Sequence, residues 1–69
     1  MQVHVIFRPR RKPAQDVRLS AKATVADLLA AVGESRDHTL AIRHAIPVTE
    51  HEPLRDGDEV TLLSAFSGG

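Results

Sequence analysis

Cysteine, tryptophan and tyrosine are absent from this chain, and its aromatic residues are limited to two phenylalanines. Without cysteine, the fold has no disulfide to support it and no side-chain thiol for catalysis or sulfur transfer. The scarcity of aromatic rings also argues against a module that binds single-stranded nucleic acid, because such modules stack bases on aromatic side chains. The composition therefore excludes thiol enzymes and disulfide scaffolds.

Long apolar runs are also missing. No stretch approaches the roughly 20 apolar residues of a membrane-spanning helix. Residues 1–5 lack the charged and apolar regions of a signal peptide. We therefore expect a soluble, cytoplasmic protein without a membrane partner.

Neither charge sign is in excess, since nine basic and nine acidic residues give a formal net charge of zero. The basic groups concentrate in residues 1–23 and the acidic groups in residues 24–69. This asymmetry can steer encounters with charged partners but does not bear on the fold. The basic loop at residues 8–12 could meet phosphates. Because neither phenylalanine, Phe7 or Phe66, sits in a basic, aromatic-rich patch, we interpret this loop as a solvated hairpin loop, and we expect no direct DNA binding.

The predicted elements indicate one small α+β domain. Chains of this size bury only about 60% of their unfolded surface, so there is room for a single core. Alternating and β-branched segments predict strands, and one amphipathic segment predicts a helix. The predicted strands are residues 1–7, 14–19, 39–44, 46–48 and 59–65, and the predicted helix is 24–32. One helix against four or five strands implies a sheet with one covered face.

The helix has the clearest local signals. Thr24 suits an N-cap, Asp27 can complete a capping box, and Gly33 supplies a C-terminal stop. The apolar positions that form one helical stripe are Val25, Leu28, Leu29 and Val32. Isolated helices shorter than ~12–15 residues are marginal in water, so this one needs tertiary packing.

Candidate catalytic and metal-binding groups give only weak signals. The histidines are His4, His38, His44 and His51. They form no helical His pair, and no cysteine joins them to complete a zinc site. The acids that cluster in turn sequence are Glu50, Glu52, Asp56, Asp58 and Glu59. We interpret these acids as loop-shaping residues that can contact a basic partner, and we expect neither a metal site nor independent catalysis.

The most informative feature that is present is the pair Gly68 and Gly69, which follows a strand-like run. Glycine has no Cβ, so such an end can enter a channel too narrow for other residues. Its α-carboxylate would be a chemical handle for another protein's active site. We expect a domain over residues 1–64 and a flexible tail over residues 65–69. The alternative is an inert end, because termini are commonly disordered.

Leu63 is expected to face away from the helix. If Leu62 points to the core, alternation places Leu63 and Thr61 on the opposite face of the sheet. On a neighbouring strand, Ala41 and Arg43 are predicted to share that outer face. We interpret these four residues as a partner-binding patch beside the tail. Leu63 can also be an ordinary exposed apolar residue.

The order ββαβββ in 69 residues, ended by Gly-Gly, resembles the ubiquitin-like β-grasp family. The resemblance is strongest to its prokaryotic sulfur carriers, which include the carrier for thiamine thiazole synthesis and the small subunit of molybdopterin synthase. Residues 62–69 are most similar to the tail of the bacterial carrier for tRNA 2-thiouridine synthesis, which can also be attached to proteins. The resemblance implies a β-grasp fold, with a mixed sheet of four to five strands packed on one helix.

The resemblance also implies a mechanism and partners. The protein would be a co-substrate rather than an enzyme and would bind no cofactor. An E1-like enzyme would use ATP to adenylate the Gly69 carboxylate, and a persulfide sulfurtransferase would supply sulfur for a thiocarboxylate. A sulfur-accepting enzyme such as a tRNA thiolase would follow. Leu63 matches the position of the partner-facing patch, Gly68 admits the tail to the active site, and the residues leading to it are Ala65, Phe66 and Ser67.

Other functions stay open at this point. The chain can be a protein modifier joined through Gly69 to lysines of target proteins. It can be a sulfur carrier for molybdopterin or thiamine thiazole synthesis. It can also be a β-grasp interaction module with an inert end. Nothing in residues 1–60 distinguishes among these acceptors.

Overall fold

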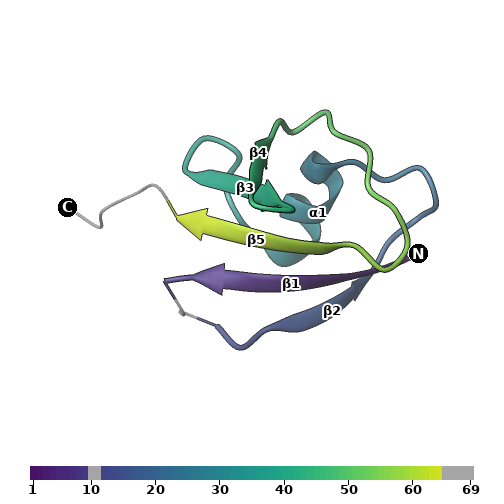
Figure 1. Cartoon of the computed structure of the whole chain (residues 1–69), viewed down its shortest axis with the longest axis horizontal. Coiled ribbons are helices and arrows are strands. Elements are labelled where there is room, and N and C mark those ends of the chain that lie inside the picture. The colour runs from purple at the N-terminus through teal and green to yellow at the C-terminus, as the bar shows by residue number, and fades with distance from the viewer. Residues whose placement is uncertain (10–11, 65–69) are drawn as a thin grey trace.

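The computed structural model describes residues 1–9 and 12–64. Five strands form one mixed sheet in the order β2-β1-β5-β3-β4, and one helix covers one of its faces (Figure 1). The elements are β1 (Gln2–Arg8), β2 (Gln15–Arg18), α1 (Val25–Val32), β3 (Thr39–Arg43), β4 (Ile46–Val48) and β5 (Glu59–Ser64). This arrangement confirms the predicted ubiquitin-like β-grasp fold.

The centre of the sheet joins the first strand to the last. β1 pairs antiparallel with β2 and parallel with β5. As the alternation predicts, Val3, Val5 and Phe7 of β1 are buried. Phe7 lies opposite Leu62 of β5, which is also buried. The inward side chains of these strands therefore form one core with the apolar stripe of α1.

Helix α1 ends at the predicted residue, Val32, and begins at Val25, directly after the predicted N-cap Thr24. The backbone N–H of Thr24 donates to Asp27 Oδ2 at 2.9 Å, which fixes the first turn. Gly33 adopts the left-handed conformation with φ 75°, and its N–H donates to the Ala30 carbonyl. Leu28 is fully buried, as the helical spacing predicts. Local sequence signals therefore determine both ends of the helix.

The second half of the sheet is a short hairpin against β5. β3 pairs antiparallel with β5 on one side and with β4 on the other. The predicted third strand was one residue too long, because His44 and Ala45 have positive φ angles and turn the chain into β4. Pro47 lies on edge strand β4, a position where a residue without a backbone N–H is tolerated.

The long connection from β4 to β5 is fixed to the helix side of the molecule. Leu54 is buried, and its N–H donates to the Ala23 carbonyl at 3.0 Å. The N–H of Val25 donates to the Glu52 carbonyl at the same distance. Leu54 therefore anchors this connection in the core. Within the ranges that the structure describes, no helix is long and apolar enough to cross a bilayer.

Candidate partner-binding face

The face of the sheet opposite α1 carries an exposed apolar patch. Paired residues of neighbouring strands point to the same face, and successive residues alternate between faces. Since Val60 and Leu62 are buried, their neighbours Thr61 and Leu63 point outward. Pairing adds the outward residues of the adjacent strands. We define the apolar patch as Ile6, Leu40, Ile42, Thr61 and Leu63.

The patch is ordered in two rows across three strands. One row runs from Ile6 through Thr61 to Ile42. The next runs from Arg8 through Leu63 to Leu40, so Arg8 adds a cation at one end. Leu40 is 39% exposed and Leu63 is 37% exposed. The four bulky aliphatic side chains of the patch therefore share one surface of the sheet; they are Ile6, Leu40, Ile42 and Leu63.

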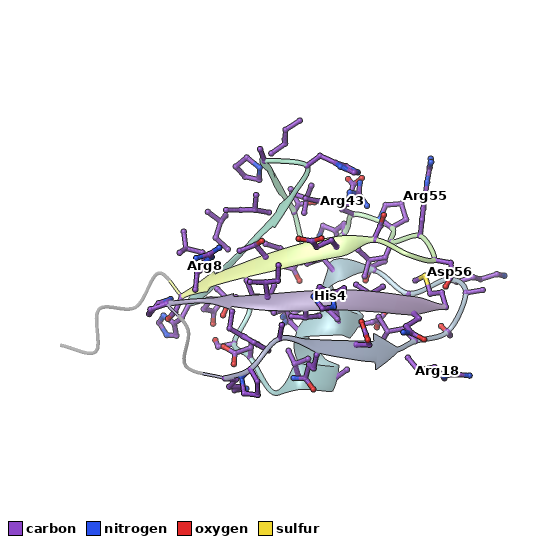
Figure 2. The ribbon with its side chains drawn as sticks, turned by 60° about the horizontal axis from the view of Figure 1, so that its bottom comes forward. His4, Arg8, Arg18, Arg43, Arg55 and Asp56 are labelled. Carbon is purple, nitrogen blue, oxygen red and sulfur yellow. The ribbon has the colours of Figure 1, made fainter. Side chains whose placement is uncertain are left out.

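The patch lies where β5 ends. Leu63 is followed by Ser64, the last residue of β5, and Arg8 ends β1 at the same edge. Figure 2 shows Arg8 at this end of the molecule and Arg55 and Asp56 at the opposite end. The predicted tail residues Ala65, Phe66, Ser67, Gly68 and Gly69 lie outside the described residues. Their roles remain predictions, but a tail that continues β5 would leave the domain beside the patch.

The same face is polar farther from Ser64. His4 Nδ1 lies 2.9 Å from Asp16 Oδ1, and both side chains are about half exposed. Glu59 lies opposite His4 on β5. His4 is labelled on the middle of β1 in Figure 2. The outer face is therefore divided into an apolar part next to Ser64 and an ionisable part away from it.

The predicted placement of Ala41 on this face is wrong. Ala41 pairs with Leu62 and is buried at 3% exposure, whereas Leu40 and Ile42 point outward. The alternation within β3 allowed either assignment, and only the register with β5 decides between them. The small side chain lies inward because the core around it is filled by larger ones, among them Phe7 and Leu62.

Arg43 is also absent from the outer patch. Its Nη1 donates to the Pro53 carbonyl at 3.0 Å and to Asp58 Oδ2 at 3.2 Å, and its Nη2 donates to Glu52 Oε2 at 2.5 Å. The Arg43 side chain is only 16% exposed. This residue holds the β4–β5 connection against β3 and is committed to the fold rather than to a partner.

Most acidic residues of the β4–β5 connection also make hydrogen bonds or ion pairs within the domain. Besides Glu52 and Asp58, Glu50 accepts from Arg36 Nη1 at 2.6 Å. Asp56 Oδ1 accepts from the backbone N–H of Gln2 at 2.8 Å. These carboxylates shape and fasten the loop, as the sequence interpretation proposed. No group of three or more potential metal ligands occurs within residues 1–9 and 12–64.

A comparison with protein-family models gives one match, the model described as the ThiS family, over residues 3–69. The match covers nearly the whole chain and includes the Gly-Gly end. The chain belongs to the ThiS family. A search of curated proteins returned no match.

Solved structures show that this ThiS-family chain has a ubiquitin-like fold. SAMP1 from Haloferax volcanii is 23% identical, with full coverage of both chains and a TM-score of 0.74. Ubiquitin from Caldiarchaeum subterraneum is 18% identical, with coverage of 100% and 98% and a TM-score of 0.75. A ubiquitin-like domain from Arabidopsis thaliana is 11% identical, with coverage of 100% and 81% and a TM-score of 0.76.

The sequence interpretation missed most of the patch of this ThiS-family chain. Leu63 and Thr61 were placed on the correct face, but Ile6, Leu40 and Ile42 were not included. A signal for Ile6 was available, because Ile6 breaks the pattern of Val3, Val5 and Phe7 as an apolar residue on the polar face of its strand. For β3, no local signal separates its two faces, since both carry apolar residues.

Proposed function

We propose that this chain is a sulfur carrier that is adenylated by a separate ATP-dependent activating enzyme and thiocarboxylated at Gly69. The observation that carries the proposal is the ThiS-family match, which spans the β-grasp domain and extends through Gly69. In this role the chain is a protein co-substrate, acts in the cytoplasm, and itself holds no cofactor. ATP is used by the partner.

The chemistry follows from the reactivity of a carboxylate. An α-carboxyl group has an ordinary pKa of about 3.3–3.7, so it is ionised near neutral pH and is a poor acyl electrophile. Transfer of AMP from ATP to this carboxylate releases pyrophosphate and gives an acyl-adenylate with a good leaving group. A sulfurtransferase persulfide then attacks the carbonyl carbon and AMP leaves. Reduction of the acyl disulfide by a thiol yields the thiocarboxylate.

The sequence of the tail suits delivery into a partner's active site. Residues 65–69 can extend roughly 17 Å at ~3.4 Å per residue. Gly68 and Gly69 add no side-chain bulk at the tip, so the carboxylate can reach a buried nucleotide. Ala65, Phe66 and Ser67 form the lead between the domain and this tip.

The apolar patch supplies the docking surface of the proposed carrier. The exposed Leu63 and Leu40, together with the half-buried Ile42 and Ile6, lie beside the end of β5 and can bind the activating enzyme while the tail enters its active site. Apolar side chains that become fully desolvated contribute most to such interfaces. Arg8 at the edge of the patch favours an acidic group on the partner.

We propose tRNA 2-thiouridine synthesis as the pathway that receives the sulfur, because residues 62–69 are most similar to the tail of the carrier for that pathway. Deletion of the gene is then expected to remove 2-thiouridine from cellular tRNA. Loss of molybdopterin or of thiamine thiazole with unchanged tRNA thiolation would assign one of those pathways instead. The same carrier chemistry serves all three acceptors.

A second candidate function is modification of proteins. The chain shares its fold, over its full length, with a solved archaeal ubiquitin. An acyl-adenylate at Gly69 can react with a lysine amine as well as with sulfur. In this case the chain would appear as an addition to the mass of target proteins, linked through an isopeptide bond.

Intact-mass spectrometry of the chain recovered from its native cell tests these functions directly. A carrier is expected to contain a fraction in which one carboxylate oxygen is replaced by sulfur, and a modifier is expected in higher-mass conjugates. Deletion of Gly69, or Gly68→Val, should abolish both products and leave the unfolding midpoint unchanged. Unaltered thiocarboxylate formation in either variant would contradict the proposed tail mechanism. A wild-type chain with neither product would indicate an inert end.

A further inference from the structure

The chain offers very few amines to an acyl donor. Its only lysines are Lys12 and Lys22, and the α-amino group of Met1 is the third amine. This scarcity matters because an activated carboxylate, which the proposed function places at Gly69, can acylate any accessible amine. The surroundings of the three amines differ strongly.

Lys12 is held by three neighbours. Its ammonium group forms a 2.9 Å ion pair with Glu34 Oε2, whose side chain is only 8% exposed. The same group donates to the Val32 carbonyl at the end of α1, at 3.1 Å. It also lies 5.0 Å from the centre of the Phe7 ring. An ammonium group has three protons to donate, and each of these contacts would be disrupted if Lys12 became a nucleophile.

The α-amino group of Met1 is also engaged. It donates to the Leu19 carbonyl at 2.6 Å, in a partly buried position. The N–H of Leu19 returns a bond to the Met1 carbonyl at 2.7 Å. This pair of bonds closes the open end of the β1–β2 hairpin, so a reaction at this amine would disturb the hairpin.

Lys22 is the exception. It is exposed, in a turn closed by the bond from Ala23 N–H to the Ser20 carbonyl. Its Nζ forms no hydrogen bond or ion pair with residues 1–9 or 12–64. Loss of its proton therefore breaks no contact in this part of the chain. Of the three amines, Lys22 alone is both exposed and uncommitted.

The position of Lys22 determines which carboxylate can reach it. β5 ends at Ser64 next to the end of β1, whereas the connection from β2 to α1 lies at the other end of the sheet (Figure 1). The two ends are about eight residues of strand apart, or roughly 26 Å. A chain of five residues, the number from 65 to 69, can span at most roughly 17 Å. The terminal carboxylate of a second molecule can approach Lys22 without having to span this distance.

We propose that Lys22 is an acylation site for the activated Gly69 of a second copy of this chain. This step rests on the proposed activation of Gly69. The neutral Lys22 amine attacks the carbonyl carbon of the acyl-adenylate, a C–N bond forms, the C–O bond to AMP breaks, and AMP leaves. The nitrogen loses its extra proton to solvent. The product is two chains joined by one Gly69–Lys22 isopeptide bond.

The first experiment ranks the amines without any enzyme. The folded chain is treated with limiting N-hydroxysuccinimidyl acetate, and acetylation of each lysine is followed by peptide mass mapping. Lys22 is expected to react roughly tenfold or more faster than Lys12, because a hydrogen-bonded ion pair must open before Lys12 reacts. In urea the two rates should converge. Equal rates in the folded chain would overturn the inference.

Glu34→Gln, which removes the charged partner of Lys12, should raise acetylation of Lys12 and leave Lys22 unchanged. Glu59→Gln is the matched control, because Glu59 lies on the outer face of β5, and should change neither rate. Circular dichroism verifies that both variants are folded. If Glu34→Gln unfolds the chain, the comparison of Lys12 with Lys22 in the wild type decides alone.

The second experiment uses the activating enzyme and ATP without a sulfur donor. We expect a product with the mass of two chains less one water, whose fragments place the link at Lys22. Lys22→Arg should eliminate this product and Lys12→Arg should retain it. Pyrophosphate release without the linked product, or a link at Lys12 or Met1, would overturn the proposal. Absence of pyrophosphate release would contradict the proposed function and with it the transfer step, while the ranking of amines is decided by the acetylation experiment.

Discussion

The two faces of the sheet differ in how far their side chains are buried or bonded within the domain. On the helix side, Leu28, Phe7 and Leu62 are buried at 2% exposure or less, and Arg43 binds three oxygen acceptors of the β4–β5 connection. On the other side, Leu40 and Leu63 remain more than a third exposed, and no helix or strand within residues 1–9 and 12–64 covers them. The inner face therefore stabilises the domain, and the outer face is the one that we propose for partner binding.

The largest expected effect on stability comes from the inner face. Leu28→Ala removes a fully buried side chain from the contact between α1 and the sheet. Such truncations cost about 2–5 kcal/mol of unfolding free energy, because burial is lost and a cavity remains. Urea denaturation measures the change. Leu63→Ala is the matched control and should cost far less. Equal losses for the two variants would remove the distinction between the faces.

A smaller loss is expected when the Arg43 side chain is removed. Arg43→Ala leaves Asp58, whose side chain is only 12% exposed, and Glu52 without their cation. We expect a loss of about 1–3 kcal/mol, since a partly buried acceptor loses its hydrogen bond. Arg55→Ala is the control, because Arg55 is exposed and its side chain makes no ion pair within the described ranges. An Arg43→Ala chain as stable as wild type would show that the hydrogen bonds of Arg43 do not stabilise the β4–β5 connection.

The outer face should respond in the opposite way. Leu63→Asp places a charge at the centre of the apolar patch and is expected to weaken binding to the activating enzyme at least tenfold, or about 1.4 kcal/mol. Its unfolding free energy should change by less than about 0.5 kcal/mol, as for most surface substitutions. Isothermal titration calorimetry and urea denaturation measure the two quantities. Strong destabilisation with unchanged affinity would assign Leu63 to the core and reject the patch.

The smallest effect is expected at the polar part of the outer face. Asp16→Asn removes the partner of His4 from a pair in which both side chains are about half exposed. Exposed pairs contribute about 0–1 kcal/mol, so a change below about 0.5 kcal/mol is expected in urea denaturation. The affinity for the activating enzyme should also stay the same. A large loss of affinity would extend the binding face beyond the apolar patch.

Sequence alone was sufficient where the deciding interactions are local. The capping residues Thr24 and Asp27, the stop at Gly33 and the spacing of the apolar stripe lie within ten residues of one another, and the helix they predict is the helix observed. The alternation of β1 was equally informative, because one of its faces is almost entirely apolar. Patterns of this kind are readable before any long-range contact is known.

Sequence was insufficient where register decides. β3 carries apolar residues on both faces, and its inward residue Ala41 is smaller than the outward Leu40 and Ile42. Pairing with β5, about twenty residues later in the chain, decides which face of β3 points to the core. The local sequence of β3 does not specify this long-range pairing. The partners of Arg43 were also unpredictable, because they lie in the β4–β5 connection, beyond the next strand.

The parallel contact between β1 and β5 has a consequence for how the molecule is built. The strand made last occupies the middle of the sheet, between the strand made first and the β3–β4 hairpin. A nascent or truncated chain that stops before Glu59 would lack the strand that joins β1 to β3, so the sheet would be in two fragments. Its core would also lack the buried side chains of Val60 and Leu62. Closure of so long a loop is slow and depends on this single segment. The domain should therefore complete its fold only after synthesis of β5, so that the activation we propose would act only on a folded domain.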